Sequence, residues 1–231
     1  MRPIVEAPSP NHDQRPGAVD VLILHYTGMK TAQDAIDRLR DPHARVSSHY
    51  VVDEDGTIYQ LVAEERRAWH AGISFWRGRT GLNDFSIGIE IVNPGHEWGY
   101  RPFPPAQIRS VTTLSQAILT RHPIPARNVI AHSDVAPDRK QDPGELFPWQ
   151  QLAAAGIGLW PRAERHETLA WDEITLRSAL ATIGYDATHL ALATLLRAFQ
   201  RHWRPDSVTG QADAGTILRL DRLLRMVAPN E

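Results

Sequence analysis

The chain has 231 residues, of which 42% are hydrophobic and 23% are charged, and its formal net charge at pH 7 is −2. This composition is typical of a folded globular protein, and the near-neutral charge gives no reason to expect a nucleic-acid partner. The sequence has no cysteine, which excludes disulfides, thiolate metal ligands and a cysteine nucleophile. Its apolar runs are far shorter than the roughly 20 residues of a membrane span, so we expect no transmembrane segment.

The N-terminal segment, residues 1–18, contains four prolines and a glycine and is expected to form an extended arm. It lacks the apolar core that a signal peptide needs. We therefore expect a cytoplasmic protein, with a periplasmic location as the alternative if a leader has been removed.

Predicted strands and helices alternate over the next part of the chain. Strands are predicted at residues 19–24, 49–52, 57–62, 85–92 and 129–131, and helices at residues 31–39 and 105–121. The turn DEDG at 53–56 joins the second and third strands as a hairpin. The alternation predicts an α/β domain over residues 19–160, with a mixed central β-sheet flanked by helices.

The sequence changes character after Trp160. Residues 161–170 are predicted to be a linker, and residues 171–231 a small C-terminal three-helix domain. Its helices are predicted at residues 176–183, 189–202 and 215–227. A unit of about 60 residues is small enough to depend partly on docking to the first domain.

Three polar residues lie where predicted strands end or shortly afterwards. His25 and His132 each follow a buried strand, and Asp142 comes ten residues after His132. Side chains at strand ends converge at one edge of a sheet, and two imidazoles with one carboxylate and an open position are typical of a catalytic zinc site. The spacing is no compact metal motif, and the alternative for any single histidine is a surface or hydrogen-bonded core residue.

Two further residues are candidates for catalysis. Glu90 stands between isoleucines in a predicted strand, where it is either a general base with a raised pKa or a carboxylate on the solvent side of the strand. Lys140 precedes Asp142 by two residues, so in an extended segment both point to the same side. It is either a cation that stabilises an oxyanion or an ordinary surface charge.

Five stretches together resemble a known family. They are LILHYT at 22–27, SSHYVVDEDGTIYQLV at 47–62, AWHAGISFWRG at 68–78, LNDFSIGIEIVN at 82–93 and VIAHSDVAPDRKQDPGELFPW at 129–149. In this order they resemble the zinc-dependent N-acetylmuramoyl-L-alanine amidases, which share a fold with T7 lysozyme and peptidoglycan recognition proteins. Within that family the chain is most similar to the AmiD-type enzymes, which act on anhydro-muropeptides and carry an extra C-terminal module.

The resemblance implies a reaction and a set of site residues. The reaction is hydrolysis of the amide bond between L-alanine and the lactyl group of N-acetylmuramic or 1,6-anhydro-N-acetylmuramic acid, in peptidoglycan turnover and recycling. The implied residues are His25, His132 and Asp142 as ligands of one zinc ion, Glu90 as the catalytic glutamate, Lys140 near the carbonyl oxygen, and Trp69, His70 and Asn83 along the substrate cleft.

The chain departs from some relatives at two places where they have arginines. It has Asp53–Glu54 at the hairpin turn and Gly81–Leu82 before the asparagine of the NDFSIG segment. Arg77 and Arg79 are the candidates to replace those arginines in binding the substrate. The C-terminal helices resemble a peptidoglycan-binding module, through the stretches GYD at 184–186, AFQRHWRP at 198–205 and TGQADAGT at 209–216.

Two other functions compete with the amidase. One is a non-catalytic peptidoglycan-binding protein of the same fold, which would have lost a metal ligand. The other is a different zinc hydrolase, such as a carbohydrate deacetylase or a protease. Because every residue assigned to chemistry precedes position 143, we also expect a chain that ends near Trp160 to keep its metal site.

Overall fold

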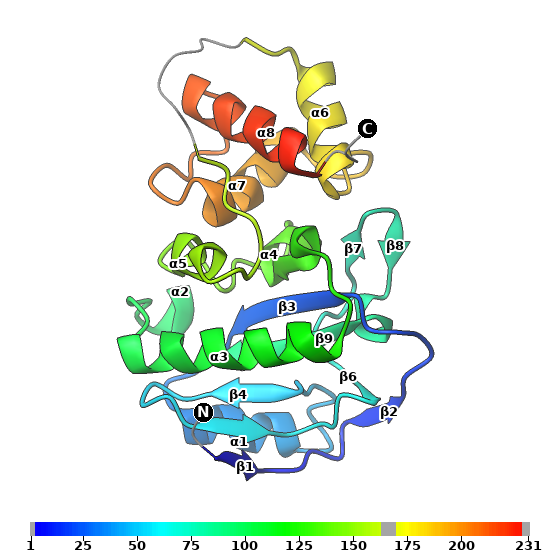
Figure 1. Ribbon diagram of the computed structural model, residues 1–231, viewed down its shortest axis with the longest axis vertical. Coiled ribbons are helices and arrows are strands. Elements are labelled where there is room, and N and C mark those ends of the chain that lie inside the picture. Colours follow the sequence, from blue (N-terminus) through cyan, green and yellow to red (C-terminus); the bar gives the residue numbers. More distant parts are fainter. Residues whose placement is uncertain (1–2, 163–169, 228–231) are drawn as a thin grey trace.

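The structure is a computed structural model, which describes residues 3–162 and 170–227. Its centre is a six-stranded sheet with the strand order β1-β5-β4-β9-β3-β10 (Figure 1). The strands are β1 (Ile4–Glu6), β3 (Val21–Tyr26), β4 (Tyr50–Val52), β5 (Ile58–Gln60), β9 (Ser86–Ile91) and β10 (Val129–Ala131). β4 and β5 form the predicted antiparallel hairpin, and the other pairings are parallel. The predicted mixed sheet is therefore confirmed.

The two central strands, β3 and β9, carry different side chains on the two faces of the sheet. Leu22 and Leu24 of β3 belong to one apolar cluster, whereas Val21 and Ile23 belong to another. Because successive side chains of a strand point to opposite faces, β3 is buried on both sides. This double burial explains why its sequence is a continuous apolar run rather than an alternating one.

Two longer helices flank the sheet. α1 (Ala32–Arg40) begins at Thr31, whose side chain accepts a hydrogen bond from the backbone N–H of Asp34. α3 (Pro105–Arg121) begins with proline, which suits the first turn of a helix because its missing N–H is not needed there. The apolar side of α3 packs on the sheet face that carries Leu22 and Leu24, so the opposite face is left for other elements.

Shorter elements connect these parts. They are the helices α2 (Gly95–Trp98), α4 (His132–Val135) and α5 (Trp149–Ala154), the 3₁₀ turns Leu82–Asp84 and Ala126–Asn128, and the strand pair β7 (Phe75–Trp76) and β8 (Arg79–Thr80). In the described part of the chain no helix is both long and apolar enough to cross a membrane.

The N-terminal segment is extended, as expected, but its described residues belong to the sheets. β1 pairs in parallel with β5 at the edge of the central sheet. β2 (His12–Gln14) pairs antiparallel with β6 (Arg66–Ala68). Both partners lie more than 50 residues further along the chain, so a local reading of the sequence gives no sign of either pairing.

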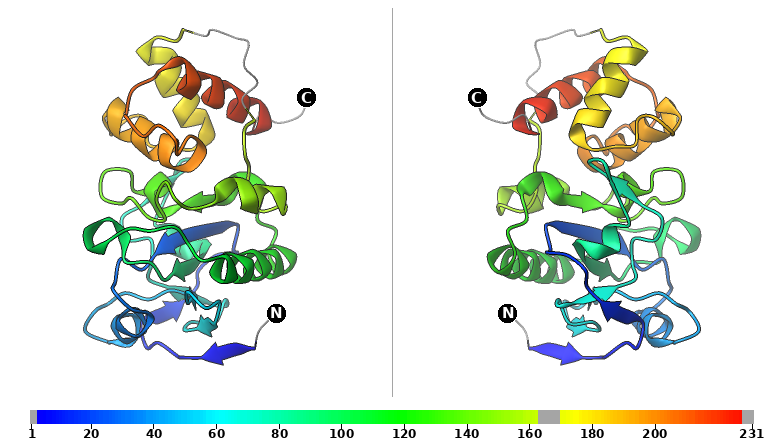
Figure 2. Two further views of the ribbon diagram at one scale, coloured as in Figure 1. Left: turned by 90° about the vertical axis from the view of Figure 1, so that its left-hand side faces the viewer. Right: turned by 90° about the vertical axis from the view of Figure 1, so that its right-hand side faces the viewer.

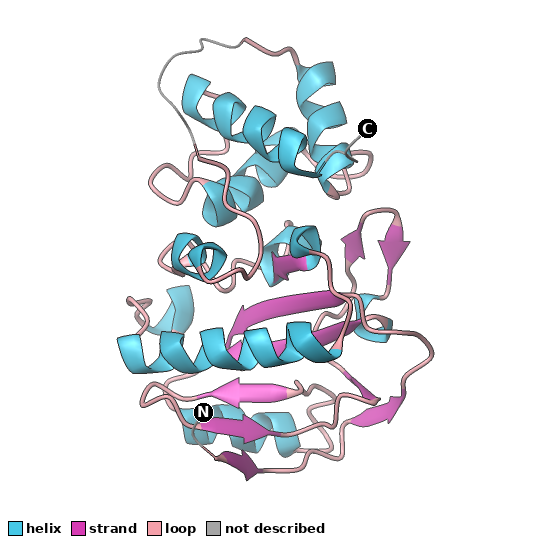
Figure 3. Cartoon of the chain, viewed as in Figure 1, coloured by secondary structure: helices cyan, strands magenta, loops and turns pink. Residues whose placement is uncertain are grey.

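The described residues of the C-terminal part, 170–227, form helices joined by loops, at the end of the molecule opposite β1 (Figures 2 and 3). The helices are α6 (Glu173–Ile183), α7 (Leu192–Trp203) and α8 (Ala214–Val227), which confirms the three predicted helices. Asp172 begins α6, and its side chain accepts from the backbone N–H of Thr175. Most of the predicted linker, residues 163–169, lies outside the described residues.

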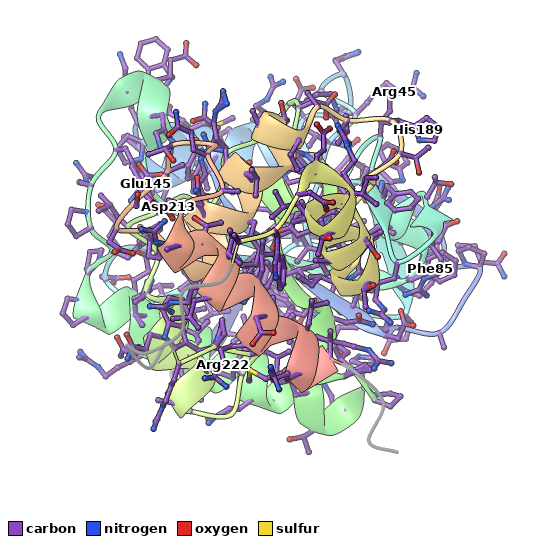
Figure 4. All side chains as sticks on the ribbon, turned by 90° about the horizontal axis from the view of Figure 1, so that it is seen from above. Arg45, Phe85, Glu145, His189, Asp213 and Arg222 are labelled. Carbon is purple, nitrogen blue, oxygen red and sulfur yellow. The ribbon has the colours of Figure 1, made fainter. Side chains whose placement is uncertain are left out.

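The helical unit, residues 170–227, shares an apolar cluster with the sheet domain. Val21 and Ile23 of β3 and Ile130 of β10 belong to the same buried cluster as side chains of α6, α7 and α8. Figure 4 looks down on this unit, with Asp213 at the start of α8 and Arg222 further along the helix. Because the cluster is continuous, the helices form part of the core around the sheet.

A buried ion cluster stabilises the fold away from the strand ends. The Glu64 carboxylate, in a residue that is 8% exposed, accepts hydrogen bonds from Tyr50 at 2.7 Å and Arg121 at 2.6 Å, and lies 2.7 Å from His122 Nε2. Burial alone would raise the pKa of Glu64, but the hydrogen bonds of Arg121, His122 and Tyr50 outweigh it and lower the pKa to about 2. The folded state therefore holds this carboxylate in its charged form.

This cluster predicts a pH-dependent contribution to stability. A group whose pKa is lower in the folded state stabilises the protein fully above its unfolded pKa, here about 4.5, and loses the effect as the pH falls toward about 2. Glu64→Gln should therefore lower the free energy of unfolding by about 1–3 kcal/mol at pH 7. Urea denaturation of both proteins should show this difference shrinking between pH 4.5 and 2; a difference that is constant over that window would contradict the assignment.

Candidate active site

The three predicted metal ligands come together at one point. His25 lies near the end of β3, His132 begins α4 directly after β10, and Asp142 follows in the next loop. The His25 Nδ1 atom lies 2.9 Å from His132 Nδ1 and 3.2 Å from Asp142 Oδ2, and His132 Nδ1 lies 2.9 Å from the same oxygen. Among the described residues, these three form a group of histidine and acidic side chains that could hold a metal ion.

The spacing of the three atoms fits a small divalent cation. Ligands bound to zinc at about 2.0–2.1 Å in a tetrahedron lie about 3.3 Å from one another. The three observed separations, from 2.9 to 3.2 Å, are close to that value. The donor set of two imidazoles and one carboxylate is also the kind that zinc accepts.

A chain of hydrogen bonds fixes the His25 ring. His25 Nε2 lies 3.0 Å from His70 Nδ1, and His70 Nε2 lies 3.2 Å from Ser86 Oγ, which itself donates to the Leu82 carbonyl at 2.7 Å. Because the Ser86 hydroxyl donates to Leu82, its oxygen accepts from the Nε2–H of His70, and His70 Nδ1 accepts in turn from the Nε2–H of His25. The Nδ1 atom of His25 therefore keeps a free lone pair. Hydrogen bonds of this kind orient metal-binding histidines.

Gly88 leaves room for the His70 ring in this series of hydrogen bonds. A Cβ atom at Gly88 would lie 2.5 Å from the His70 ring, so no larger residue fits beneath it. His132 is oriented in a similar way, because its Nε2 lies 3.2 Å from the Ala71 carbonyl. Its Nδ1 atom is then also free to bind a metal ion.

The electrostatics of the site favour metal-binding protonation states. Burial and the neighbouring His132 lower the pKa of His25 to about 4, so its imidazole is neutral at neutral pH. Burial would raise the pKa of Asp142, but His132 and His25 outweigh it and hold that pKa below its usual range. Two neutral imidazoles and a carboxylate are the forms that bind a divalent cation.

Glu90 lies on the same face of the sheet as His25. The two residues pair in register across the parallel strands β3 and β9, and paired residues point to the same side. One carboxylate oxygen of Glu90, Oε2, is buried without a hydrogen-bond partner in the described structure. Burial and the nearby Asp142 raise the pKa of Glu90 well above its usual value, whereas Lys140 lowers it.

A cleft of about 410 Å³ opens over this group. His132, Asp142, Glu90, Lys140 and His70 all line it. The cleft therefore brings an unpaired carboxylate and a lysine beside the candidate metal ligands. This arrangement allows proton transfer and stabilisation of negative charge next to a bound cation.

The structure does not bring the other expected substrate-binding residues to this cleft. The Asn83 side chain accepts from the backbone N–H groups of His70 and Ala71 and so holds their loop. Arg77 donates to the Thr182 and Ile183 carbonyls of α6, and Arg79 forms an ion pair with Asp20.

Trp69 likewise does not line the cleft, and its backbone N–H donates to Ser47. The guanidinium groups of Arg77 and Arg79 are engaged elsewhere, and a role for these two arginines in binding the substrate stays a prediction. Of the five expected substrate-binding residues only His70 lines the cleft, and His70 also supports His25.

Ser86 was missed by the sequence reading. Ser86, Gly88 and Glu90 alternate with three isoleucines that pack on the opposite face of β9. That period of two, with a hydroxyl, a glycine and a carboxylate on one face, was a visible signal for a polar site on this strand.

Fold and site together define a class of protein, namely a mixed α/β protein with a candidate single-metal hydrolytic centre, in which a carboxylate lies beside the metal ligands at the ends of parallel strands. Comparison of the sequence with known protein families agrees with this class. The model of the N-acetylmuramoyl-L-alanine amidase family matches residues 14–145, and the chain belongs to this family.

Individual relatives match over different lengths. The chain is 42% identical to the N-acetylmuramoyl-L-alanine amidase AmiD of Escherichia coli, over 89% of this chain and 82% of that protein. The structure of E. coli AmiD with the substrate anhydro-N-acetylmuramic acid-L-Ala-D-γ-Glu-L-Lys matches with a TM-score of 0.81 and 40% identity, covering 97% of this chain and 93% of the other. The 1,6-anhydro-N-acetylmuramyl-L-alanine amidase AmpD of Enterobacter cloacae is 35% identical, over 64% of this chain and 87% of its own.

Proposed function

We propose that the protein hydrolyses the amide bond between L-alanine and the lactyl group of N-acetylmuramic or 1,6-anhydro-N-acetylmuramic acid. The observation that carries the proposal is the triangle of His25, His132 and Asp142 beside a cleft that His132, Asp142 and the unpaired carboxylate of Glu90 line. The names of the relatives support the substrate, since both AmiD and AmpD are amidases of muramyl-L-alanine compounds. The complete ligand set disfavours a binding protein that has lost its activity.

We propose zinc as the metal that His25, His132 and Asp142 hold. Zinc bound there would polarise the amide carbonyl and make a water molecule a stronger nucleophile near neutral pH. The lowered pKa values of His25 and Asp142 favour the unprotonated forms of these two ligands at neutral pH.

Glu90 and Lys140 have separate roles in the proposed reaction. Glu90 takes a proton from the attacking water, whose oxygen then bonds to the amide carbon. As the carbon–nitrogen bond breaks, Glu90 gives that proton to the nitrogen, because an amine is a poor leaving group unless it is protonated. Lys140 places a positive charge beside the carbonyl oxygen while that oxygen is negative. The products are the free lactyl carboxylate and a peptide that begins with L-alanine.

Mass spectrometry of a digested anhydro-muropeptide tests this function directly. We expect two products, the anhydro-muramic acid sugar and the intact peptide with a free L-alanine amine. Cleavage within the peptide would indicate a protease, and loss of an acetyl group would indicate a deacetylase. An uncleaved substrate that binds the protein would indicate a binding protein of the same fold. Any of these three results rejects the amidase.

A further inference from the structure

A second acidic residue lies close to the metal ligands without being one of them. Asp134, in α4, is 1% exposed. Its Oδ2 atom accepts from the backbone N–H of Ala131 at 2.8 Å and lies 2.6 Å from His202 Nδ1, and its Oδ1 atom accepts from the Tyr185 hydroxyl at 2.6 Å. The carboxylate thus has three close polar partners, as a buried carboxylate requires.

Two of these partners come from the helical unit. Tyr185 follows α6, and His202 lies in the last turn of α7. Each is 1% exposed. The His202 ring is stacked between Trp149 and Trp203, with 3.7 Å between ring centroids on both sides. The two donors are therefore held rigidly and face no competition from solvent.

Asp134 connects these donors to two metal ligands. The Ala131 N–H that it binds belongs to the residue directly before His132, so the carboxylate fixes the turn from β10 into α4. Within the same turn the Ser133 N–H donates to the Asp142 carbonyl at 3.0 Å. A shift of Asp134 would thus move the backbone that presents both His132 and Asp142.

We infer that the helical unit supports the metal site, with Tyr185 and His202 as positioning residues that act through Asp134 on His132 and Asp142. The role expected for these helices from the sequence was binding of peptidoglycan, with a metal site independent of them. A chain that ends near Trp160 would lose both donors and leave the Asp134 carboxylate with only the Ala131 N–H of these three partners. The family match covers residues 14–145, whereas Tyr185 and His202, which partner Asp134 in this chain, lie beyond that range.

The test compares two tyrosine-to-phenylalanine variants. Tyr185→Phe removes the hydroxyl that binds Asp134, and Tyr50→Phe removes a hydroxyl that donates to the Glu64 carboxylate, which is also buried, at 2.7 Å. We expect Tyr185→Phe to weaken zinc binding by about 10-fold, the lower end for loss of a hydrogen-bond partner behind metal ligands. Tyr50→Phe should bind zinc as the unaltered protein does. Its denaturation midpoint should fall by about as much as that of Tyr185→Phe. Competition with a chelator measures the affinities.

Two results overturn the inference: a Tyr185→Phe protein with unchanged zinc affinity, or an equal loss in both variants. If Tyr185→Phe does not fold, Asp134→Asn removes the charge while keeping the shape, and it should weaken zinc binding by a similar factor. Unchanged affinity in that variant would also count against the inference. The inference rests on the proposed metal site, but the failures differ, because unaltered protein that binds no zinc rejects the metal site itself.

Discussion

Glu90→Gln is expected to lower kcat by about 10²–10⁴-fold, the usual contribution of a general base. Glutamine keeps the size of the side chain but cannot take a proton from water or give one to the leaving nitrogen. The metal ligands are untouched, so zinc affinity should stay within a few-fold of the unaltered protein. KM should change less than kcat, because proton transfer occurs only in the transition state. Steady-state kinetics on an anhydro-muropeptide, with zinc content measured in parallel, gives both quantities.

Glu64→Gln is the matched control for this substitution. It makes the same chemical change at a buried carboxylate that is bound to Arg121 and Tyr50 and does not line the cleft. This variant should lose stability but keep its kcat. A Glu90→Gln enzyme with near-native kcat would show that the attacking water needs no base and that Glu90 is structural.

Removal of the metal should abolish activity, and added zinc should restore it. A chelator competes with the three candidate ligands for the ion, and the protein side chains remain in place to bind zinc again when it is added. The metal-free protein should stay folded, because its core consists of apolar side chains on both faces of the sheet. Activity and far-ultraviolet circular dichroism, measured before chelation, after it and after addition of zinc, test both statements.

His132→Ala complements the chelation experiment. It removes one ligand, leaves two, and should reduce activity to background without recovery in excess zinc. Full activity of rigorously metal-free protein would reject a metal-dependent mechanism. Unfolding on chelation would instead make the ion structural as well as catalytic.

The strand-end positions of His25 and His132, together with the family resemblance, pointed to the candidate metal ligands in the sequence. His25 and His132 lie at the carboxyl ends of two strands, and the structure pairs those strands directly. The orientation of Glu90 also follows from alternation along one strand, once β9 is paired with β3 in register. Chemistry that depends on strand ends and on a period of two can be read from the sequence alone.

The substrate-binding assignments could not be read in the same way. Trp69, Asn83, Arg77 and Arg79 lie in or near the family motifs, but motif membership does not fix where a side chain points. Asn83 satisfies backbone N–H groups and Arg77 binds carbonyls of α6. The sheet pairing of β1 and the contacts of Tyr185 and His202 also depend on residues far apart in the chain. No local pattern contains that information.

The candidate metal ligands lie far apart along the chain, which bears on how the protein would acquire a metal ion. His25 and Asp142 are separated by 117 residues, so during synthesis the first ligand leaves the ribosome long before the last. Parallel strands such as β3 and β10 pair only after the intervening chain has closed a long loop, which makes this kind of folding slow. A nascent chain that ends before His132 therefore presents only one of the three candidate ligands, and a single imidazole holds a cation weakly. The ion should enter a protein that has already folded, from the cleft side and after translation has ended.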